Sequence, residues 1–407
     1  MKGEGLRIMK KVKKKRRFTM KKKYLASWIT FLIIVTAVTL VGCGSKGISN
    51  DNDSTQTQST TGNKEDNESE GGKKEITFLG WGSPTEVKTF ETLIENFEAQ
   101  YLDVEVNYIS VPASDFDTKL QTMIAGGKQP DVFYLRPENV MPWADNGRLY
   151  DISSYVNDNE IFDESNVWAK AIDMYRYDGN VPGTGNIYGL PKDIGPFALA
   201  YNKDLFEEAG IPDPDPDIPW TWDEFLENAK KLTKGEGTDK QYGTATYSLE
   251  SAIWSNGADW LDESKTKVTI TDSKFIEAMQ WVADLALVHG VMITQEDEAA
   301  LGSFQRWIDG KIGMMGIGPW SQAQFWEECE FEWDLMPWPT SPSTGENAVW
   351  YGGMGYGVSP NSLYIEESCN LAAFLAFNED AQVTNYQMGQ AVPNFIDMTK
   401  DGYLKMT

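Results

Sequence analysis

The sequence predicts an α/β protein made of two lobes that are joined by crossover segments. Strand-like and helix-like segments alternate over residues 75–135 and again over residues 219–320, and this alternation is typical of sheets flanked by helices. Between the two regions lies the run Tyr188-Gly-Leu-Pro-Lys-Asp-Ile-Gly-Pro-Phe197, in which glycine and proline redirect the backbone. Alone, this run would fit an ordinary strand with turns. Its position between two α/β regions predicts a crossover with a cleft at the join.

The first region contains three predicted strands that are separated by two amphipathic helices. The strands are expected at residues 75–79, 104–109 and 132–135, and the first helix follows the turn at residues 80–84. In a sheet with this order, ligands bind beyond the carboxyl ends of the strands. We therefore expect binding residues at 81–84 and at 135–139.

The second region repeats the pattern after the crossover. Thr221 and Glu224 have the spacing of a capping box and predict a helix start. Further predicted segments are a strand at 242–247, a helix at 275–288, a helix–strand–turn unit at 304–320, a second crossover at 335–339, a glycine-rich strand at 352–358 and a helix at 371–377.

The N-terminal segment has the pattern of a secretory signal. Residues 1–23 are strongly basic, and residues 25–41 are apolar and uncharged, which also fits an uncleaved membrane anchor. Leu40-Val-Gly-Cys43 resembles the bacterial lipobox, which favours cleavage before Cys43 and lipidation of that residue. We expect a signal peptide at 1–42, with residues 1–19 as an over-extended start before Met20. Residues 43–74 are polar enough to predict a disordered tether.

The charge and the cysteine content narrow the function classes. The net charge is −25, and removing residues 1–42 leaves 24 basic and 60 acidic side chains, a net charge of −36. Such a surface excludes nucleic acid as a partner. Two cysteines remain, Cys329 and Cys369, and they fit either a disulfide or two buried thiols.

Catalytic sites are poorly supported by the sequence. His289 is the single histidine, and any serine or cysteine nucleophile with a histidine base would have to use it. The run Asp213-Pro-Asp-Pro-Asp217 fits a stiff loop better than a calcium site, and no metal or cofactor is expected. A glycosidase needs only two carboxylates, so a secreted carbohydrate-active enzyme stays the alternative to a binding protein.

Several short motifs, in order, resemble the extracellular solute-binding proteins of ABC sugar importers, the group that contains maltose-binding protein. The resemblance runs from about residue 75 to the end of the chain. The motifs are Ala125-Gly-Gly-Lys-Gln-Pro-Asp-Val-Phe133, Tyr188-Gly-Leu-Pro191, Tyr201-Asn-Lys-Asp204, Gly210-Ile-Pro212, Thr221-Trp-Asp-Glu-Phe225, Gly318-Pro-Trp320, Gly352-Gly353 and Gln390-Ala-Val-Pro393.

The resemblance implies a fold like that of the periplasmic binding proteins, in which each lobe is a mainly parallel sheet flanked by helices. The first lobe is expected at 75–193 and 340–385, and the second at 197–336 and 390–407. Because the family continues with further helices, we expect the chain to be incomplete after Thr407. The implied function is a monomeric receptor on the outer face of the membrane, lipid-anchored through Cys43. It would bind a carbohydrate, with an oligosaccharide favoured, and deliver it to importer permease subunits, although the sequence does not name the sugar. A sugar sensor on the same scaffold is a further alternative.

The candidate binding residues follow from the chemistry of a sugar ring. A pyranose presents an apolar face, which an indole matches, and a rim of hydroxyls, which polar side chains match. Trp320 matches the family position at which an aromatic ring stacks on sugar. Each tryptophan also fits a core position, and each polar residue fits a surface ion pair or a turn. The candidates are Trp81, Ser83, Arg136, Glu138, Asp193, Trp254, Trp320 and Trp350.

Overall fold

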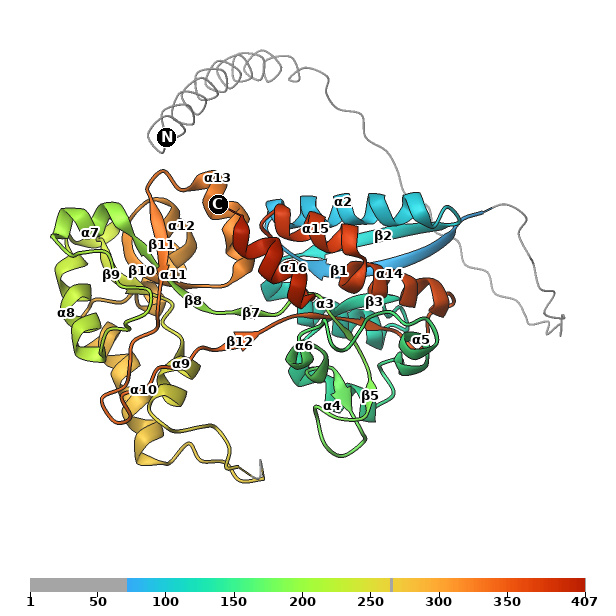
Figure 1. Cartoon of the computed structure of the whole chain (residues 1–407), viewed down its shortest axis with the longest axis horizontal. Helices are drawn as coiled ribbons and strands as arrows, with labels where there is room; N and C mark the ends of the chain where they lie inside the picture. Colours follow the sequence, from blue (N-terminus) through green and yellow to red (C-terminus); the bar gives the residue numbers. More distant parts are fainter. Residues whose placement is uncertain (1–71, 264–265, 407) are drawn as a thin grey trace, which may run out of the picture. The chain divides into compact units, whose positions relative to one another are not determined.

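The computed structural model describes residues 72–263 and 266–406 (Figure 1). The predicted signal peptide, the lipidation site at Cys43 and nearly all of the predicted tether lie outside the described residues. Within the described ranges, no helix is both long enough and apolar enough to cross a bilayer.

The first lobe is built on a five-stranded mixed sheet in the order β2-β1-β3-β13-β6. Strand β1 is parallel to β2 and β3, whereas β13 is antiparallel to β3 and β6. The antiparallel strand is the one that returns from the other lobe, so the sheet is less parallel than the sequence pattern predicts. The strands are β1 Lys74–Trp81, β2 Val104–Val111, β3 Val132–Leu135, β6 Leu190–Pro191 and β13 Gly355–Val358.

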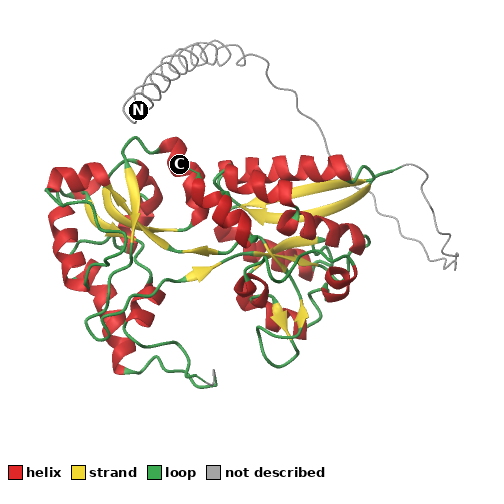
Figure 2. Cartoon of the chain, in the orientation of Figure 1, coloured by secondary structure: helices red, strands yellow, loops and turns green. Residues whose placement is uncertain are grey.

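Helices cover the first sheet and bury its apolar face (Figure 2). Helix α2 (Pro84–Gln100) begins at a capping box formed by Ser83 and Glu86, and its residues Phe90 and Phe97 are fully buried. The other helices are α3 Ala113–Ala125, η1 Pro137–Asn139, α4 Val140–Asp145, α5 Ser153–Asp158, α6 Ala169–Asp173, α14 Ile365–Phe377, α15 Glu379–Gln387, α16 Ile396–Asp401 and η4 Tyr403–Lys405. A small hairpin pairs β4 (Arg176–Tyr177) with β5 (Asn186–Ile187).

The second lobe contains a four-stranded sheet in the order β11-β8-β10-β9. Strand β10 is parallel to β9 and antiparallel to β8, which is also antiparallel to β11. The strands are β8 Ala198–Asn202, β9 Tyr242–Ala245, β10 Ile312–Ile317 and β11 Trp333–Met336. The helices are α7 Lys203–Ala209, α8 Trp222–Leu232, η2 Gly237–Asp239, α9 Leu249–Ser255, α10 Ser273–Leu287, α11 Gln295–Ala300, α12 Ser303–Ile308, η3 Pro319–Ser321 and α13 Gln322–Glu328.

Two short strands form the crossover between the lobes. Strand β7 (Gly195–Pro196) pairs with β12 (Tyr351–Gly352) in antiparallel register. The predicted return to the first lobe at residue 340 is wrong by about ten residues. Trp338 is buried in the second-lobe core, and the Ser341 hydroxyl is hydrogen-bonded to Asn256 of that lobe. These contacts hold the chain on the second lobe until it reaches β12.

The C-terminal segment 390–406 contacts both lobes, and its prediction as part of the second lobe is wrong for most of its length. Phe395 belongs to the first-lobe core and forms a β-bridge with Val167. The Asn394 side-chain amide donates to the Pro191 carbonyl at 2.7 Å. Tyr403 then reaches the second lobe, because its hydroxyl accepts from the Gln322 side-chain amide at 2.7 Å. The segment therefore lies on the first lobe and ties its end to the second.

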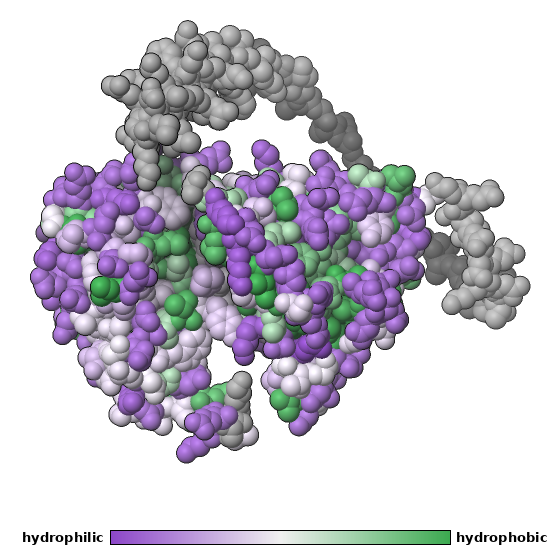
Figure 3. Space-filling model, in the orientation of Figure 1, coloured by the Kyte–Doolittle hydropathy of each residue, from purple (hydrophilic) through white to green (hydrophobic). Residues whose placement is uncertain are grey.

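The visible surface of both lobes is largely hydrophilic (Figure 3). On this face, hydrophobic residues gather where the lobes meet. The polar exterior agrees with the strongly acidic composition, since charged side chains remain solvated.

Candidate functional site

A cavity of about 600 Å³ lies beside the crossover and is lined by residues of both lobes. This volume lies in the range of small-molecule sites in proteins. Six of the eight residues predicted from the sequence line it: Trp81, Ser83, Arg136, Asp193, Trp320 and Trp350.

The first-lobe wall is centred on Trp81 at the end of β1. Its ring centroid lies 4.5 Å from that of Phe116 and 4.9 Å from that of Tyr134, both at steep interplanar angles. The Arg136 guanidinium lies 4.8 Å from the Trp81 ring centroid, in cation–π geometry. The Arg136 Nε atom is 3.5 Å from a carboxylate oxygen of Asp117. The indole is thus held by packing, and the guanidinium is held beside it.

The second-lobe wall consists of Trp320 and Trp350, which both pack on Phe197. The Phe197 ring centroid lies 6.4 Å from that of Trp320 and 5.8 Å from that of Trp350. Each indole also folds over a glycine: a Cβ at Gly318 would lie 2.2 Å from the Trp320 ring, and one at Gly352 would lie 2.4 Å from the Trp350 ring. The glycines therefore fix where the indoles lie, because any side chain there would displace them.

A buried ion pair forms the polar floor of the cavity. Lys192 and Asp193 are 4% and 6% exposed and are bonded to each other through Nζ and Oδ2. The Met354 N–H donates to Asp193 Oδ1 at 3.0 Å. The Lys192 Nζ atom also lies 5.7 Å from the Phe90 ring centroid and 5.8 Å from that of Tyr134. The pair thus links the outgoing crossover to the returning one, since Met354 follows β12.

The N-terminus of α2 supplies the remaining polar groups. The Ser83 hydroxyl accepts from the Glu86 N–H at 3.3 Å, and Glu86 Oε2 accepts from the Ser83 N–H at 2.7 Å. The other carboxylate oxygen of Glu86 accepts from the Gln390 side-chain amide at 2.7 Å. Both oxygens of Glu86 are therefore already hydrogen-bonded within the protein.

Two predicted residues lie elsewhere. Glu138 is in the short helix η1 and is exposed to solvent, outside the lining of the cavity. Trp254 is on α9, packs against the second-lobe core, and donates from its indole N–H to Asp259 at 3.0 Å. The position of Arg136 directly after strand β3 correctly predicted that it lines the cavity. Glu138 follows the same strand, but it lies in η1 and points toward solvent.

Sequence reasoning missed several lining residues. Lys192 had a signal in its position next to Asp193, and Glu86 had one in its capping-box spacing from Ser83. Gly353 belongs to the Gly352-Gly353 motif, and the others had no local signal, because folding brings them together from separate helices and strands. The missed residues are Glu86, Ala113, Tyr134, Lys192, Phe304, Ser321, Gln324, Gly353 and Met354, whereas Gly82 lies within the predicted range 81–84.

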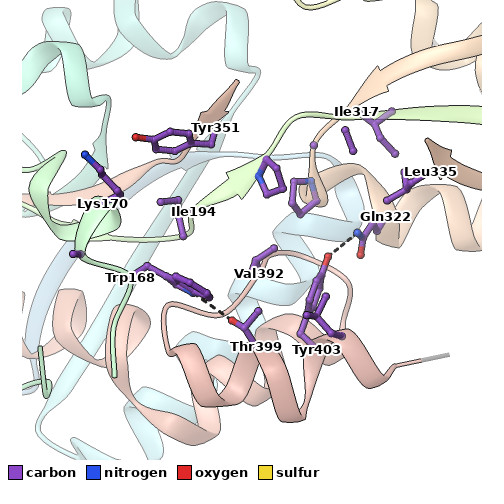
Figure 4. Close-up of a pocket in the computed structure, with 16 residues that line it drawn as sticks. Trp168, Lys170, Ile194, Ile317, Gln322, Leu335, Tyr351, Val392, Thr399 and Tyr403 are labelled. Carbon is purple, nitrogen blue, oxygen red and sulfur yellow. Dashed lines mark hydrogen bonds between the residues drawn. The ribbon is translucent and has the colours of Figure 1, made fainter. Parts of the chain in front are cut away.

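A second cavity, of about 550 Å³, lies between the crossover, β10 and the C-terminal segment (Figure 4). Its wall is mostly apolar and includes Ile194, Ile317 and Val392. Its polar side chains are largely satisfied by one another: Gln322 bonds to Tyr403, and the Trp168 indole N–H lies 3.4 Å from the Thr399 hydroxyl. This cavity offers few free polar groups for a hydroxylated ligand, so the first cavity is the better candidate site.

Comparison with known sequences places the chain in a family. The family model for bacterial extracellular solute-binding proteins matches residues 81–382. A binding protein of Brucella abortus is 26% identical over 292 residues, which cover 69% of this chain and 65% of that protein. A lipoprotein of Streptomyces antibioticus is 26% identical over 307 residues, which cover 72% of this chain and 62% of that protein. The chain thus spans slightly less than two thirds of the length of these relatives.

Comparison with solved structures gives the same fold. The ABC substrate-binding protein from Listeria monocytogenes in complex with cycloalternan has a TM-score of 0.74 and 29% identity, covering 82% of this chain and 84% of that one. The maltose/maltodextrin-binding domain from Bdellovibrio bacteriovorus bound to maltotriose has a TM-score of 0.67 and 17% identity. The match covers 81% of this chain and 84% of that one. The two-lobed α/β fold predicted from the sequence is confirmed. The chain belongs to the bacterial extracellular solute-binding proteins, a family whose solved members include oligosaccharide-binding components of ABC transporters.

Proposed function

We propose that the chain is a lipid-anchored receptor on the outer face of the bacterial membrane. It binds a carbohydrate in the cavity between its lobes and delivers the sugar to the permease subunits of an ABC importer. The observation that carries this proposal is the composition of that cavity, in which three indoles, Trp81, Trp320 and Trp350, surround a polar floor.

The cavity fits a neutral, hydroxylated ligand. Indole faces match the C–H faces of sugar rings, and the polar groups match the hydroxyl rim. The charged residues of the lining are two cations, Arg136 and Lys192, and two carboxylates, Glu86 and Asp193. The charges balance, so the lining favours a ligand without net charge. Hydrogen bonds to charged groups contribute about 1.5–3 kcal/mol each, and a few of these reach the ~8 kcal/mol of a micromolar complex.

The carboxylates of the cavity favour binding over hydrolysis. A glycosidase needs one carboxyl group that protonates the leaving oxygen and a second that acts as base or nucleophile. Glu86 accepts hydrogen bonds from Ser83 and Gln390, and Asp193 is bonded to Lys192 and Met354. Both are engaged in holding the structure, which leaves neither free for such roles.

A thermal-shift screen of the full chain tests the proposal. The panel would contain maltose, maltotriose, cycloalternan and common monosaccharides, with calorimetric titration of each hit. A sugar at 100 times its Kd adds about 2.7 kcal/mol of stability, which is a shift of several degrees for most domains. Assay of new reducing ends in the same samples separates a receptor from an enzyme. Absence of any shift across the panel would contradict carbohydrate binding, and time-dependent hydrolysis would favour the glycosidase.

A further inference from the structure

Two hydroxyl groups on the cavity wall have no hydrogen-bond partner in the described protein. They belong to Tyr134 on β3 of the first lobe and to Ser321 at the end of η3 of the second lobe. Each residue is only 2% exposed. The two lobes therefore each contribute to the lining of this cavity one residue whose hydroxyl group is buried and unpaired.

Packing explains the ring of Tyr134 but not its oxygen. The ring centroid lies 4.9 Å from that of Trp81, 5.7 Å from that of Phe78 and 5.8 Å from that of Phe90. A phenylalanine would make the same ring contacts. Leaving a buried hydroxyl without a partner is destabilising, and most buried polar groups in native proteins are hydrogen-bonded.

Local structure likewise leaves the oxygen of Ser321 unexplained. Ser321 precedes α13 but has helical backbone angles, φ −84° and ψ −17°, unlike the extended residue whose hydroxyl usually caps a helix. Here it makes no capping hydrogen bond. Its neighbour Trp320 is turned onto Phe197, and Ser321 and Gln324 are both lining residues of the cavity. Capping does not account for its hydroxyl.

We propose that the hydroxyls of Tyr134 and Ser321 bind the ligand, one from each lobe, and select for a ligand rich in hydroxyl groups. This inference rests on the proposed function and names two of the groups that would give it specificity. A hydroxyl both donates and accepts, so each can pair with a sugar hydroxyl without introducing charge. Burial raises the pKa of Tyr134 well above its usual value, so the phenol keeps its proton and can donate.

Binding through these oxygens requires a small movement of the wall. Both oxygens are closed to solvent in this arrangement. A ligand must therefore displace the side chains that cover them, and its binding energy then depends on the rearranged wall. Because the two groups come from different lobes, a ligand that pairs with both holds the lobes in one relative position.

The test uses variants that each remove a single oxygen, Tyr134→Phe and Ser321→Ala. In the free protein, removing an unpaired buried hydroxyl should leave the melting temperature unchanged or raise it. Affinity for whichever panel sugar binds the wild type should fall about threefold to tenfold for each variant, as expected for one hydrogen bond. Ser321→Thr keeps the hydroxyl and should retain most of the affinity. Each variant should thus lose affinity without losing stability, a combination that a merely structural role would not produce.

Two matched controls come from unpaired buried hydroxyls outside the cavity. Tyr175 in the first lobe and Thr244 in the second are both fully buried and also lack a partner. Tyr175→Phe and Thr244→Val should therefore have similar effects on stability and leave affinity unchanged.

The outcomes separate this inference from the proposed function. If the wild type binds no sugar of the panel, the proposed function fails and this inference falls with it. If the wild type binds and both cavity variants bind equally well, the inference alone is overturned. A loss confined to one variant overturns the pairing of the two lobes. If Tyr134→Phe does not fold, the Ser321→Ala and Ser321→Thr pair still decides the outcome for the second lobe.

Discussion

At the scale of single residues, the site depends on where large side chains are held. The turn Gly318-Pro319 was the sequence signal for Trp320, and the structure gives its physical basis. The indole lies over Gly318 and against Phe197. A tryptophan held in this way loses little conformational entropy when a ligand stacks on it. Trp254 has no such support from a glycine, and its ring packs on the second-lobe core instead.

Trp320→Ala should weaken sugar binding by one to two orders of magnitude, about 1.4–2.8 kcal/mol. It should lower stability less, because the indole is only half-buried. Titration and thermal melting of the same sample would measure both. Trp254→Ala is the matched control: it should lower stability and leave affinity unchanged. A core role for Trp320 would instead appear as a stability loss of ~3–5 kcal/mol with unchanged affinity.

The two cysteines, whose pairing the sequence leaves open, are free thiols in separate lobes. Burial raises the pKa of Cys329 and of Cys369 to about 12. At pH 8 only about one thiol in ten thousand is then ionised, and the thiolate is the reactive form. Iodoacetamide should therefore react slowly with the native protein and rapidly with both residues in urea. Fast labelling before unfolding, or a disulfide on a non-reducing gel, would contradict this prediction.

At the scale of elements, local patterns predicted the regular segments well and their boundaries less well. The capping box predicted at Thr221 marks a helix start in the structure, since its hydrogen bonds are local. The crossover at β12 lies some ten residues after the predicted boundary. Its position depends on long-range contacts, such as Trp338 with Phe197, which sequence periodicity does not contain.

The β7–β12 crossover should be intolerant of side chains at Gly353. A Cβ there would lie 2.0 Å from the Asp193 carbonyl oxygen, and that contact is with backbone, which cannot turn away. Gly353→Ala should therefore lower the free energy of unfolding by about 1–3 kcal/mol, the usual range for overpacking. Urea unfolding measures the change. Gly72→Ala, where nothing lies within 4 Å, is the control and should be neutral. Equal stability of the two variants would refute the close contact.

At the scale of the whole molecule, the two-lobed α/β fold followed from the sequence, whereas the path of the chain between the lobes did not. Strand–helix alternation is repeated in each lobe, so the fold class could be predicted from short stretches of the sequence. The placement of segment 390–406 could not, because it depends on contacts such as Asn394 with Pro191. The cavity shows the same division: six lining residues were predicted from short motifs and strand ends, whereas residues such as Tyr134 on β3 and Phe304 on α12 enter the lining only through the packing of the lobes.

The lipid anchor is tested on the intact chain in its bacterial membrane. Cys43→Ala should remove lipidation and shift the protein from the membrane fraction to the medium or the soluble fraction. Labelling with an alkyne fatty acid, followed by fractionation, measures both effects, and Cys329→Ala is a control that should stay lipidated. Wild-type protein without lipid would refute the anchor. An Ala variant that stays in the membrane would indicate an uncleaved apolar segment.

A probe attached to the C-terminal segment would report relative movement of the two lobes. It rests on the first lobe through Phe395 and is tied to the second through the bond between Tyr403 and Gln322. Relative movement of the lobes must therefore alter the surroundings of its end. Leu404 is 67% exposed, and burial raises the pKa of both native thiols, which disfavours their labelling. With an environment-sensitive dye attached through a Leu404→Cys substitution, the proposed binding of sugar could be followed by fluorescence from a reporter outside the lining of the binding cavity.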